Sequence, residues 1–239
     1  MKTVILAGGL GTRLQEETIT TPKPMVKVGE YPIIWHIMDI YSYFGFNEFV
    51  FALGYMQEHF KEYFYEQKEK HIHYIDTGLR TQTGGRIKRL ANYLDERFFL
   101  TYGDGVANID ISNLLSFHLK HGKIATITAV HPPARFGGLI LNGNTVTEFE
   151  EKHPTREGWI NGGFFVFEPE VLDYLVSDSC ILEREPLENL AQEGQLMAYR
   201  HEGFWQCMDT MRDVRLLNEL WERGNAPWKI NSGKAAESL

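Results

Sequence analysis

The sequence predicts an α/β domain: a mixed, mostly parallel sheet that helices flank, with a small hairpin extension. Over the first 130 residues, short apolar runs alternate with longer helical patterns, which is typical of a parallel sheet wrapped by helices. The runs lie at residues 4–6, 49–52, 98–101 and 124–127. After residue 130 the pattern is strand-like at 138–141, 145–149 and 163–167. Residues 142–144, Asn-Gly-Asn, suit a turn between the first two, so we expect this half to be a hairpin-bearing extension of the same sheet.

Apolar periodicity predicts helices in three segments. Residues 33–44 place four apolar side chains on one face, namely Ile34, Ile37, Met38 and Tyr41. Residues 113–120 follow Ser112, which is expected to cap that helix. Residues 210–224 form an amphipathic pattern that ends at Gly224. The polar tail 231–239 is expected to be disordered, which leaves residues 1–230 as a single domain.

Composition narrows the class of protein. The chain has 239 residues with 43% hydrophobic content, enough for one well-buried core. A formal net charge of −8 argues against a nucleic-acid or anionic-lipid partner held by a basic surface. No apolar run is long enough for a membrane helix and no signal peptide is present, so we expect a cytoplasmic protein. Its two cysteines, Cys180 and Cys207, are expected to be buried and inert.

A glycine-rich segment follows the first strand. LAGGLGTRL, residues 6–14, should lie at the carboxyl edge of the sheet, where open α/β folds bind ligands. A dinucleotide fingerprint would need glycine at position 14, which is Leu14, and no Gly-Lys-Ser/Thr of a Walker loop occurs. Glycines that admit backbone N–H groups, with the permanent charge of Arg13, favour another phosphate-binding loop. The alternative is an ordinary turn after a strand.

Three further charged residues suit phosphoryl chemistry. Lys23 lies between Pro22 and Pro24, which should hold it on a stiff extended segment. Asp104, flanked by glycines at the end of a strand, suits Mg²⁺, and Asp209 before the last helix is the natural second ligand. The alternatives are a solvated lysine, a turn aspartate at 104 and a helix-capping aspartate at 209.

Together, these motifs resemble the bacterial glucose-1-phosphate cytidylyltransferases, within the sugar-1-phosphate nucleotidyltransferase family. The opening loop is shared by many proteins of that family, and PKPMV (22–26) adds to the resemblance. WHIM (35–38), TGGR (83–86) and FWQCMDT (204–210) are narrower markers of the cytidylyltransferases. The resemblance covers nearly the whole chain. It implies the Rossmann-like nucleotide-diphospho-sugar transferase fold and Mg²⁺-dependent transfer of a cytidylyl group from CTP to glucose 1-phosphate, giving CDP-glucose and pyrophosphate. It also implies a homo-oligomer.

The resemblance assigns roles to individual residues. It implies that Arg13, Lys23 and Asp104 are catalytic and that Asp104 and Asp209 bind Mg²⁺. The sugar phosphate is assigned to Lys152, Asn161, Gly162 and Trp205. The nucleotide is assigned to Leu6, Ala7, Gly8, Gly9, Gly11, Thr12, Arg13, Lys23, Thr81, Arg86 and Gly103. The resemblance implies in-line attack of the sugar phosphate oxygen on the α-phosphorus of CTP. Such a reaction needs cations and backbone hydrogen-bond donors, and it does not need a nucleophilic triad.

Several of these residues could instead have a purely structural role. Arg86 could simply be exposed on a helix at 86–93, and Lys152 could be a solvated loop charge, since His153 stands where the family has proline. Asn161 could belong to a plain turn before a strand, and Trp205 could lie in the core.

One departure from the family leaves other functions open. Only a short segment around residues 65–73 lies between the region of residues 63–64 and the loop at 76–78. In the family this segment is longer by a couple of dozen residues. This shortening puts the oligomeric state in doubt. The alternatives are cytidylyl or uridylyl transfer to another sugar phosphate or phosphonate, and an inactive module that binds nucleotide sugars.

Overall fold

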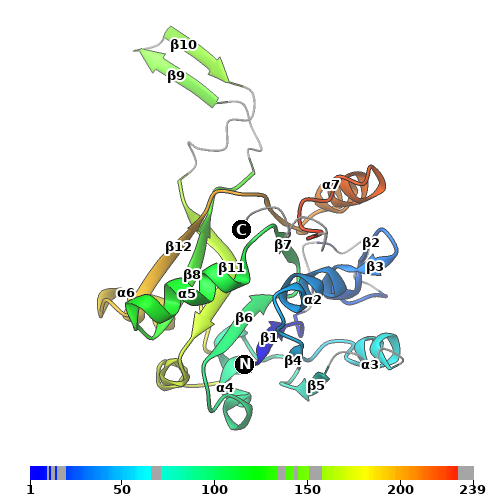
Figure 1. Ribbon diagram of the computed structural model, residues 1–239, viewed down its shortest axis with the longest axis vertical. Helices are drawn as coiled ribbons and strands as arrows, with labels where there is room; N and C mark the ends of the chain where they lie inside the picture. The colour runs from blue at the N-terminus through cyan, green and yellow to red at the C-terminus, as the bar shows by residue number, and fades with distance from the viewer. Residues whose placement is uncertain are drawn as a thin grey trace, which may run out of the picture.

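A seven-stranded sheet forms the centre of the computed structural model, which describes residues 1–9, 11, 14, 20–65, 71–133, 138–142, 145–150 and 158–230 (Figure 1). The strand order is β12-β8-β11-β6-β1-β4-β5. The strands are β1 (Thr3–Leu6), β4 (Glu48–Leu53), β5 (His71–Asp76), β6 (Phe98–Tyr102), β8 (Ala125–Val130), β11 (Ile160–Phe167) and β12 (Leu196–His201). β11 runs antiparallel to both neighbours and the remaining pairs are parallel, so the predicted mixed, mostly parallel sheet is confirmed.

The sheet is buried on both faces, because successive residues of a strand point to opposite sides. Ile5 belongs to one buried apolar cluster and its neighbour Val4 to the other. The cluster around Ile5 includes residues of α2 (Ile33–Tyr43), α3 (Glu58–Phe64), α5 (Ile111–His121) and α7 (Met211–Glu222). The cluster around Val4 includes residues of α4 (Thr83–Arg89), α6 (Glu185–Gln192) and the 3₁₀ helix η5 (Pro169–Tyr174). This two-sided burial explains why the strands are continuous apolar runs.

The helices follow the predicted pattern with one correction. In α2 the four residues of the expected face, Ile34, Ile37, Met38 and Tyr41, are all fully buried. α5 is capped by Asp110, whose carboxylate accepts from the Asn113 backbone N–H at 2.8 Å. The expected cap, Ser112, therefore lies inside the first turn, because the side chain two residues earlier already satisfies that N–H. α7 ends just before Gly224, which has φ +68° as expected for a residue after a helix end. Within the described ranges, no helix combines the length and apolarity needed to cross a bilayer.

The hairpin forms, but not as part of the central sheet. β9 (Gly138–Asn142) and β10 (Thr145–Glu150) pair with each other in a sheet of two strands that projects away from the body (Figure 1). The half after residue 130 therefore extends the central sheet through β11, which pairs with β8, and the hairpin precedes β11 as a separate pair of strands. Residues 143–144 of the turn and the tail 231–239 lie outside the described residues.

Shorter elements complete the chain. Two small antiparallel sheets pair β2 with β3 and β7 with β13. Their bounds and those of the remaining 3₁₀ helices are β2 (Lys27–Val28), β3 (Tyr31–Pro32), β7 (Gly105–Ala107), β13 (Trp205–Cys207), η2 (Lys23–Met25) and η3 (Ala91–Tyr93). The β7–β13 pair places a segment from the end of the chain beside Asp104.

Candidate active site

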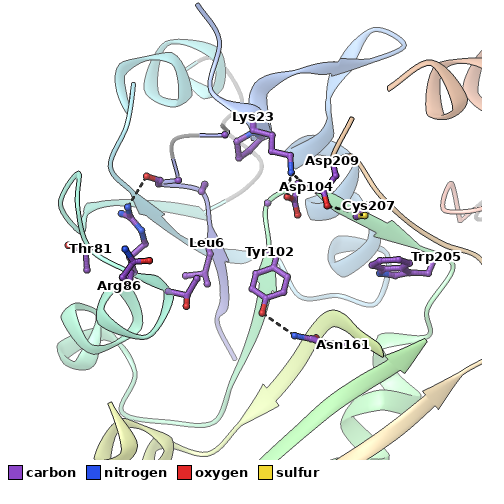
Figure 2. A pocket seen from close by; sticks show the side chains of 18 residues that line it. Leu6, Lys23, Thr81, Arg86, Tyr102, Asp104, Asn161, Trp205, Cys207 and Asp209 are labelled. Atoms are coloured by element: carbon purple, nitrogen blue, oxygen red, sulfur yellow. Dashed lines mark hydrogen bonds and ion pairs between the residues drawn. The ribbon is translucent and has the colours of Figure 1, made fainter. Parts of the chain in front are cut away.

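A cavity of about 540 Å³ opens at the carboxyl ends of β1 and β6 (Figure 2). This is the edge at which open α/β sheets bind ligands. Most of the residues predicted for the site line it, although they come from segments spread over the whole chain. Those residues are Leu6, Ala7, Gly8, Gly9, Gly11, Lys23, Thr81, Arg86, Gly103, Asp104, Asn161, Trp205 and Asp209. Thr12, Arg13 and Lys152 lie outside the described residues.

Two glycines of the site allow neighbouring segments to approach one another closely. A Cβ on Gly8 would overlap the guanidinium of Arg86, and a Cβ on Gly103 would lie 2.9 Å from Pro24 Cγ. A Cβ on Gly9, in contrast, would meet no atom within 4 Å. Gly8 and Gly103 are therefore required by packing, whereas Gly9 leaves its space to the cavity.

Arg86 is buried under the glycine loop instead of being exposed on a helix. Its guanidinium donates to the backbone oxygens of Gly8 (2.8 Å), Leu53 (3.0 Å) and Gly78 (2.9 Å), and to the Thr77 hydroxyl (2.7 Å). Burial lowers the pKa of Arg86, while the nearby carboxylate of Asp76 opposes this shift. The alternative of an exposed arginine is wrong. The hydrogen bonds show Arg86 tying the loop after β1 to the segments after β4 and β5.

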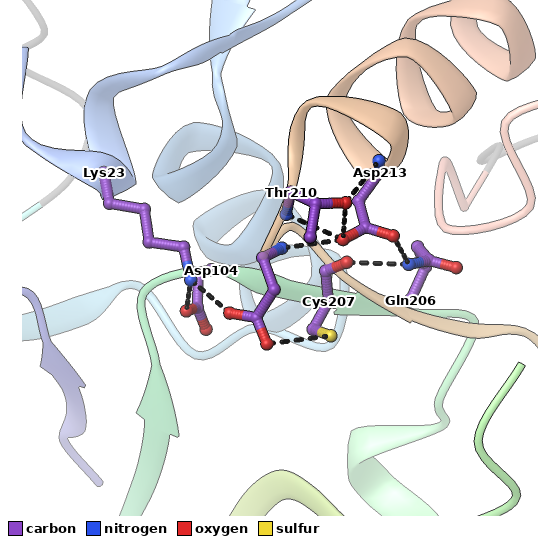
Figure 3. Close-up of polar contacts among 7 residues, drawn as sticks. Lys23, Asp104, Gln206, Cys207, Thr210 and Asp213 are labelled. Carbon is purple, nitrogen blue, oxygen red and sulfur yellow. Dashed lines mark hydrogen bonds and ion pairs between the residues drawn. The ribbon is translucent and has the colours of Figure 1, made fainter. Parts of the chain in front are cut away.

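Lys23 lies between the two predicted metal ligands. Its Nζ is 2.5 Å from Asp104 Oδ2 and 2.6 Å from Asp209 Oδ1, and only 11% of its side chain is exposed (Figure 3). Burial alone would lower the pKa of Lys23, but the two carboxylates, Asp104 above all, outweigh it and raise that pKa. The alternative of a solvated lysine is wrong.

The backbone around Lys23 differs from the prediction. Lys23 begins the one-turn 3₁₀ helix η2, whereas a stiff extended segment was expected. Pro22 is extended, with φ −61° and ψ 141°, but Pro24 falls in the first turn, where its missing N–H is not needed. Two prolines around a lysine therefore permit a helical turn.

The donor set at this point suits a magnesium ion. Two carboxylates from distant parts of the chain converge on one cation, and carboxylate oxygens are the protein ligands that Mg²⁺ prefers. In the described part of the chain, no group of three or more His, Cys, Asp or Glu side chains could hold a metal ion. A site with two carboxylates fits a metal that takes its remaining ligands from phosphates and water.

The Asp209 carboxylate does not cap α7, which was the alternative that the sequence left open. Thr210 is the cap of α7 and forms a capping box with Asp213. One oxygen of Asp213 accepts from the backbone N–H groups of Asp209 (3.1 Å) and Thr210 (2.8 Å), and the other accepts from Gln206 Nε2 at 3.1 Å (Figure 3). Asp213 thus holds the backbone of Asp209 so that its side chain points to Lys23.

The opposite side of the cavity is formed by β11 and β13. Asn161 belongs to β11 itself, where the pairing with β8 is irregular, and not to a turn before it. Trp205 is half-buried and donates from Nε1 to the Gly162 carbonyl oxygen at 2.7 Å, so it lines the cavity and does not lie in the core. Gly162 contributes this contact from beside the cavity.

Sequence reasoning missed Tyr102 and Cys207, which also line the cavity. Tyr102 precedes the Gly-Asp-Gly motif and Cys207 precedes Asp209 by two residues, so proximity to those motifs was the available signal. Cys207 is half-buried, which corrects the expectation that both thiols are buried. Burial raises the pKa of Cys207 to about 12, with the charges of Asp209 and Asp104 acting in the same direction. The expected inertness of this thiol is consistent with that pKa.

The chain is similar in sequence to known nucleotidyl transferases over most of its length. Residues 2–222 match the family described as nucleotidyl transferase. The chain is 48% identical over 254 residues to a glucose-1-phosphate cytidylyltransferase of Salmonella typhimurium, which covers 96% of this chain and 99% of the relative. It is 43% identical, over 96% of its length and 100% of the relative, to a probable glucose-1-phosphate cytidylyltransferase of Bacillus subtilis.

Solved structures share the fold at low sequence identity. A putative glucose-1-phosphate thymidylyltransferase of Bacillus anthracis has a TM-score of 0.75 and 20% identity, over 98% of both chains. HddC of Yersinia pseudotuberculosis has a TM-score of 0.75 and 22% identity, over 92% of this chain and 99% of its own. These structures confirm the predicted nucleotide-diphospho-sugar transferase fold.

Proposed function

Because the chain belongs to the nucleotidyl transferase family, we propose that it transfers a cytidylyl group from CTP to glucose 1-phosphate and releases pyrophosphate. The observation that carries this proposal is the meeting of Lys23, Asp104 and Asp209 in the cavity beside the glycine loop. Such a site offers cations and carboxylates for phosphoryl chemistry, which needs no nucleophilic side chain. The 48% identical relative supports the choice of CTP and glucose 1-phosphate.

A divalent metal is general in this family, and we propose that it is Mg²⁺ here. Asp104 and Asp209 would hold it. When bound, the ion supplies positive charge against the phosphates of the nucleotide. Lys23 would then hold a phosphate oxygen of one substrate, because the metal would take its place between the carboxylates. Arg13, which lies outside the described residues, would bind the pyrophosphate that leaves.

The remaining contacts divide between the two substrates. We assign the cytosine side to Thr81 and Arg86, with Arg86 acting through the backbone that it holds. Asn161, Gly162 and Trp205 form the sugar side, with Lys152 as a further phosphate ligand. We further propose that the protein works in the cytoplasm as a homo-oligomer. Light scattering on the purified protein tests the oligomer, and a monomeric mass would contradict it.

The decisive assay measures pyrophosphate release with Mg²⁺, glucose 1-phosphate and each nucleoside triphosphate in turn. We expect release with CTP, and none above background would reject the proposal. A panel of other sugar phosphates and phosphonates as acceptors separates close alternatives. Asp104→Asn should abolish turnover while the protein keeps its fold. If a correctly folded Asp104→Asn variant turns over normally, Asp104 is not part of the mechanism.

A further inference from the structure

Glu183 is an exposed residue outside the cavity lining that hydrogen-bonds to two residues of the cavity wall. Its Oε1 accepts from the Tyr102 hydroxyl at 2.5 Å, and its Oε2 accepts from Thr83 Oγ1 at 2.7 Å. Tyr102 ends β6 and Thr83 begins α4, and both side chains line the cavity. Glu183 itself lies in the turn before α6, some eighty residues or more from either partner. One carboxylate therefore joins a wall that carries Arg86 to a wall that carries Asp104.

The contact with Glu183 fixes the hydrogen-bonding sense of Tyr102. A tyrosine hydroxyl has a single proton, and here that proton goes to Glu183. The phenol oxygen must therefore act as an acceptor toward everything else, and it accepts from Asn161 Nδ2 at 3.1 Å. Asn161 is oriented in turn, because its Oδ1 accepts from the Gly163 N–H at 2.8 Å. The result is a directed chain from Asn161 through Tyr102 to Glu183.

The environment of Tyr102 keeps this arrangement rigid. Its ring packs edge-on against Phe165, and a Cβ on Gly163, which has φ +78°, would lie 2.6 Å from the ring. Burial raises the pKa of Tyr102, and the charge of Glu183 raises it further, so the phenol stays protonated at neutral pH. Tyr102 and Asn161 lie on the side of the cavity near Trp205, away from Thr81 and Arg86 (Figure 2).

We propose that Glu183 is a positioning residue that sets Tyr102 as an acceptor and Asn161 as a donor for the hydroxyl groups of the sugar phosphate. This inference rests on the proposed function. Without Glu183, the phenol proton can rotate toward the cavity and oppose a sugar hydroxyl that must donate there. Glu183 thereby acts on the affinity for the sugar phosphate more than on the affinity for CTP, which it reaches only through Thr83 at the start of α4.

The test separates the two KM values in purified variants of the full chain. Glu183→Ala and Tyr102→Phe should each raise KM for glucose 1-phosphate about tenfold, which corresponds to one hydrogen bond. Each should leave KM for CTP within about twofold. In the double variant the effects should not multiply, because Glu183 acts through the hydroxyl that Tyr102→Phe removes. Glu183→Gln, whose amide oxygen can still accept the phenol proton, should raise the same KM less than the alanine variant does. Tyr102→Phe carries the test if the alanine variant does not fold.

The chain offers a matched control at another tyrosine–glutamate contact. Tyr174 donates to Glu193 at 2.5 Å on the exposed surface, and neither residue lines the cavity. Tyr174→Phe and Glu193→Gln should leave both KM values unchanged.

Four results would count against the inference, and they differ in what they reject. Glu183 variants that raise both KM values equally, or that multiply with Tyr102→Phe, overturn it while the proposed function stands. A lower melting temperature with normal kinetics also overturns it alone. A wild-type chain that releases no pyrophosphate from CTP and glucose 1-phosphate overturns both.

Discussion

Replacing Lys23 by methionine should remove the cation that lies between the Asp104 and Asp209 carboxylates. Lys23, Asp104 and Asp209 have only 11%, 28% and 21% of their side chains exposed. Removing one partner of a buried ion pair costs about 3 to 5 kcal/mol, and the partial exposure here reduces the expected loss to about 2 to 3 kcal/mol. For a chain of this size, the melting temperature should fall by about 5 to 10 °C.

Magnesium should restore much of that stability in the variant. With the ammonium gone, both carboxylates can bind the ion, and 10 mM Mg²⁺ at a Kd of about 1 mM would return about 1.4 kcal/mol. The wild-type protein should gain less, because Lys23 already occupies the same oxygens. Thermal unfolding with and without Mg²⁺ measures both effects.

The matched control for this experiment is Lys27→Met, which removes an exposed lysine four residues further along the chain. It should change neither the melting temperature nor its response to the ion. The reasoning is refuted if Lys23→Met costs no stability in metal-free buffer, or if Mg²⁺ shifts the variant and the wild type equally.

Three more predictions follow from packing and charge in the site. Arg86→Met should lower the free energy of unfolding in urea by about 2 to 4 kcal/mol, since it removes several buried charged hydrogen bonds; a loss under about 1 kcal/mol would contradict that role. Gly85→Ala should be strongly destabilising, because its Cβ would clash with the Asp178 carbonyl oxygen, whereas Gly9→Ala should be neutral in the same urea titration. Cys207 has a pKa of about 12, so only about one thiol in ten thousand is ionised at pH 8. We therefore expect mass spectrometry to show little alkylation of Cys207 by iodoacetamide in the native protein at that pH. Rapid labelling of the native protein would contradict this.

The sheet was predictable because its signal is local. Apolar runs such as those of β1 and β4 are buried on both faces, and each needs no distant information to be recognised. The place of the β9–β10 hairpin was not predictable in the same way. Which strand pairs with β8 depends on competition between distant segments, and β11 takes that position. The cap of α5 failed on a finer scale, since Asp110 and Ser112 are both good capping residues two positions apart.

In the site, too, local motifs were predictable and contacts between distant segments were not. Glycine spacing and short motifs indicated Lys23, Asp104 and Asp209, and the structure brings these three together. The orientation of the Arg86 side chain could not be predicted from the residues around it. Its partners are carbonyl groups whose positions are set by three separate strands. The cap of α7 could have been predicted from the sequence, because Thr210 and Asp213 have the spacing of a capping box.

The late position of Asp209 in the chain has a consequence for protein synthesis. Its carboxylate reaches Lys23 only because β13 pairs with β7, one hundred residues upstream, and because the Met208 N–H donates to the Asp104 carbonyl oxygen at 2.8 Å. A ribosome-bound chain that has folded its first half already has the glycine loop, Lys23 and Asp104, yet lacks the second carboxylate. A truncated product that ends before Asp209 therefore has only one of the two carboxylates that surround Lys23. Both are present only once translation has passed Asp209.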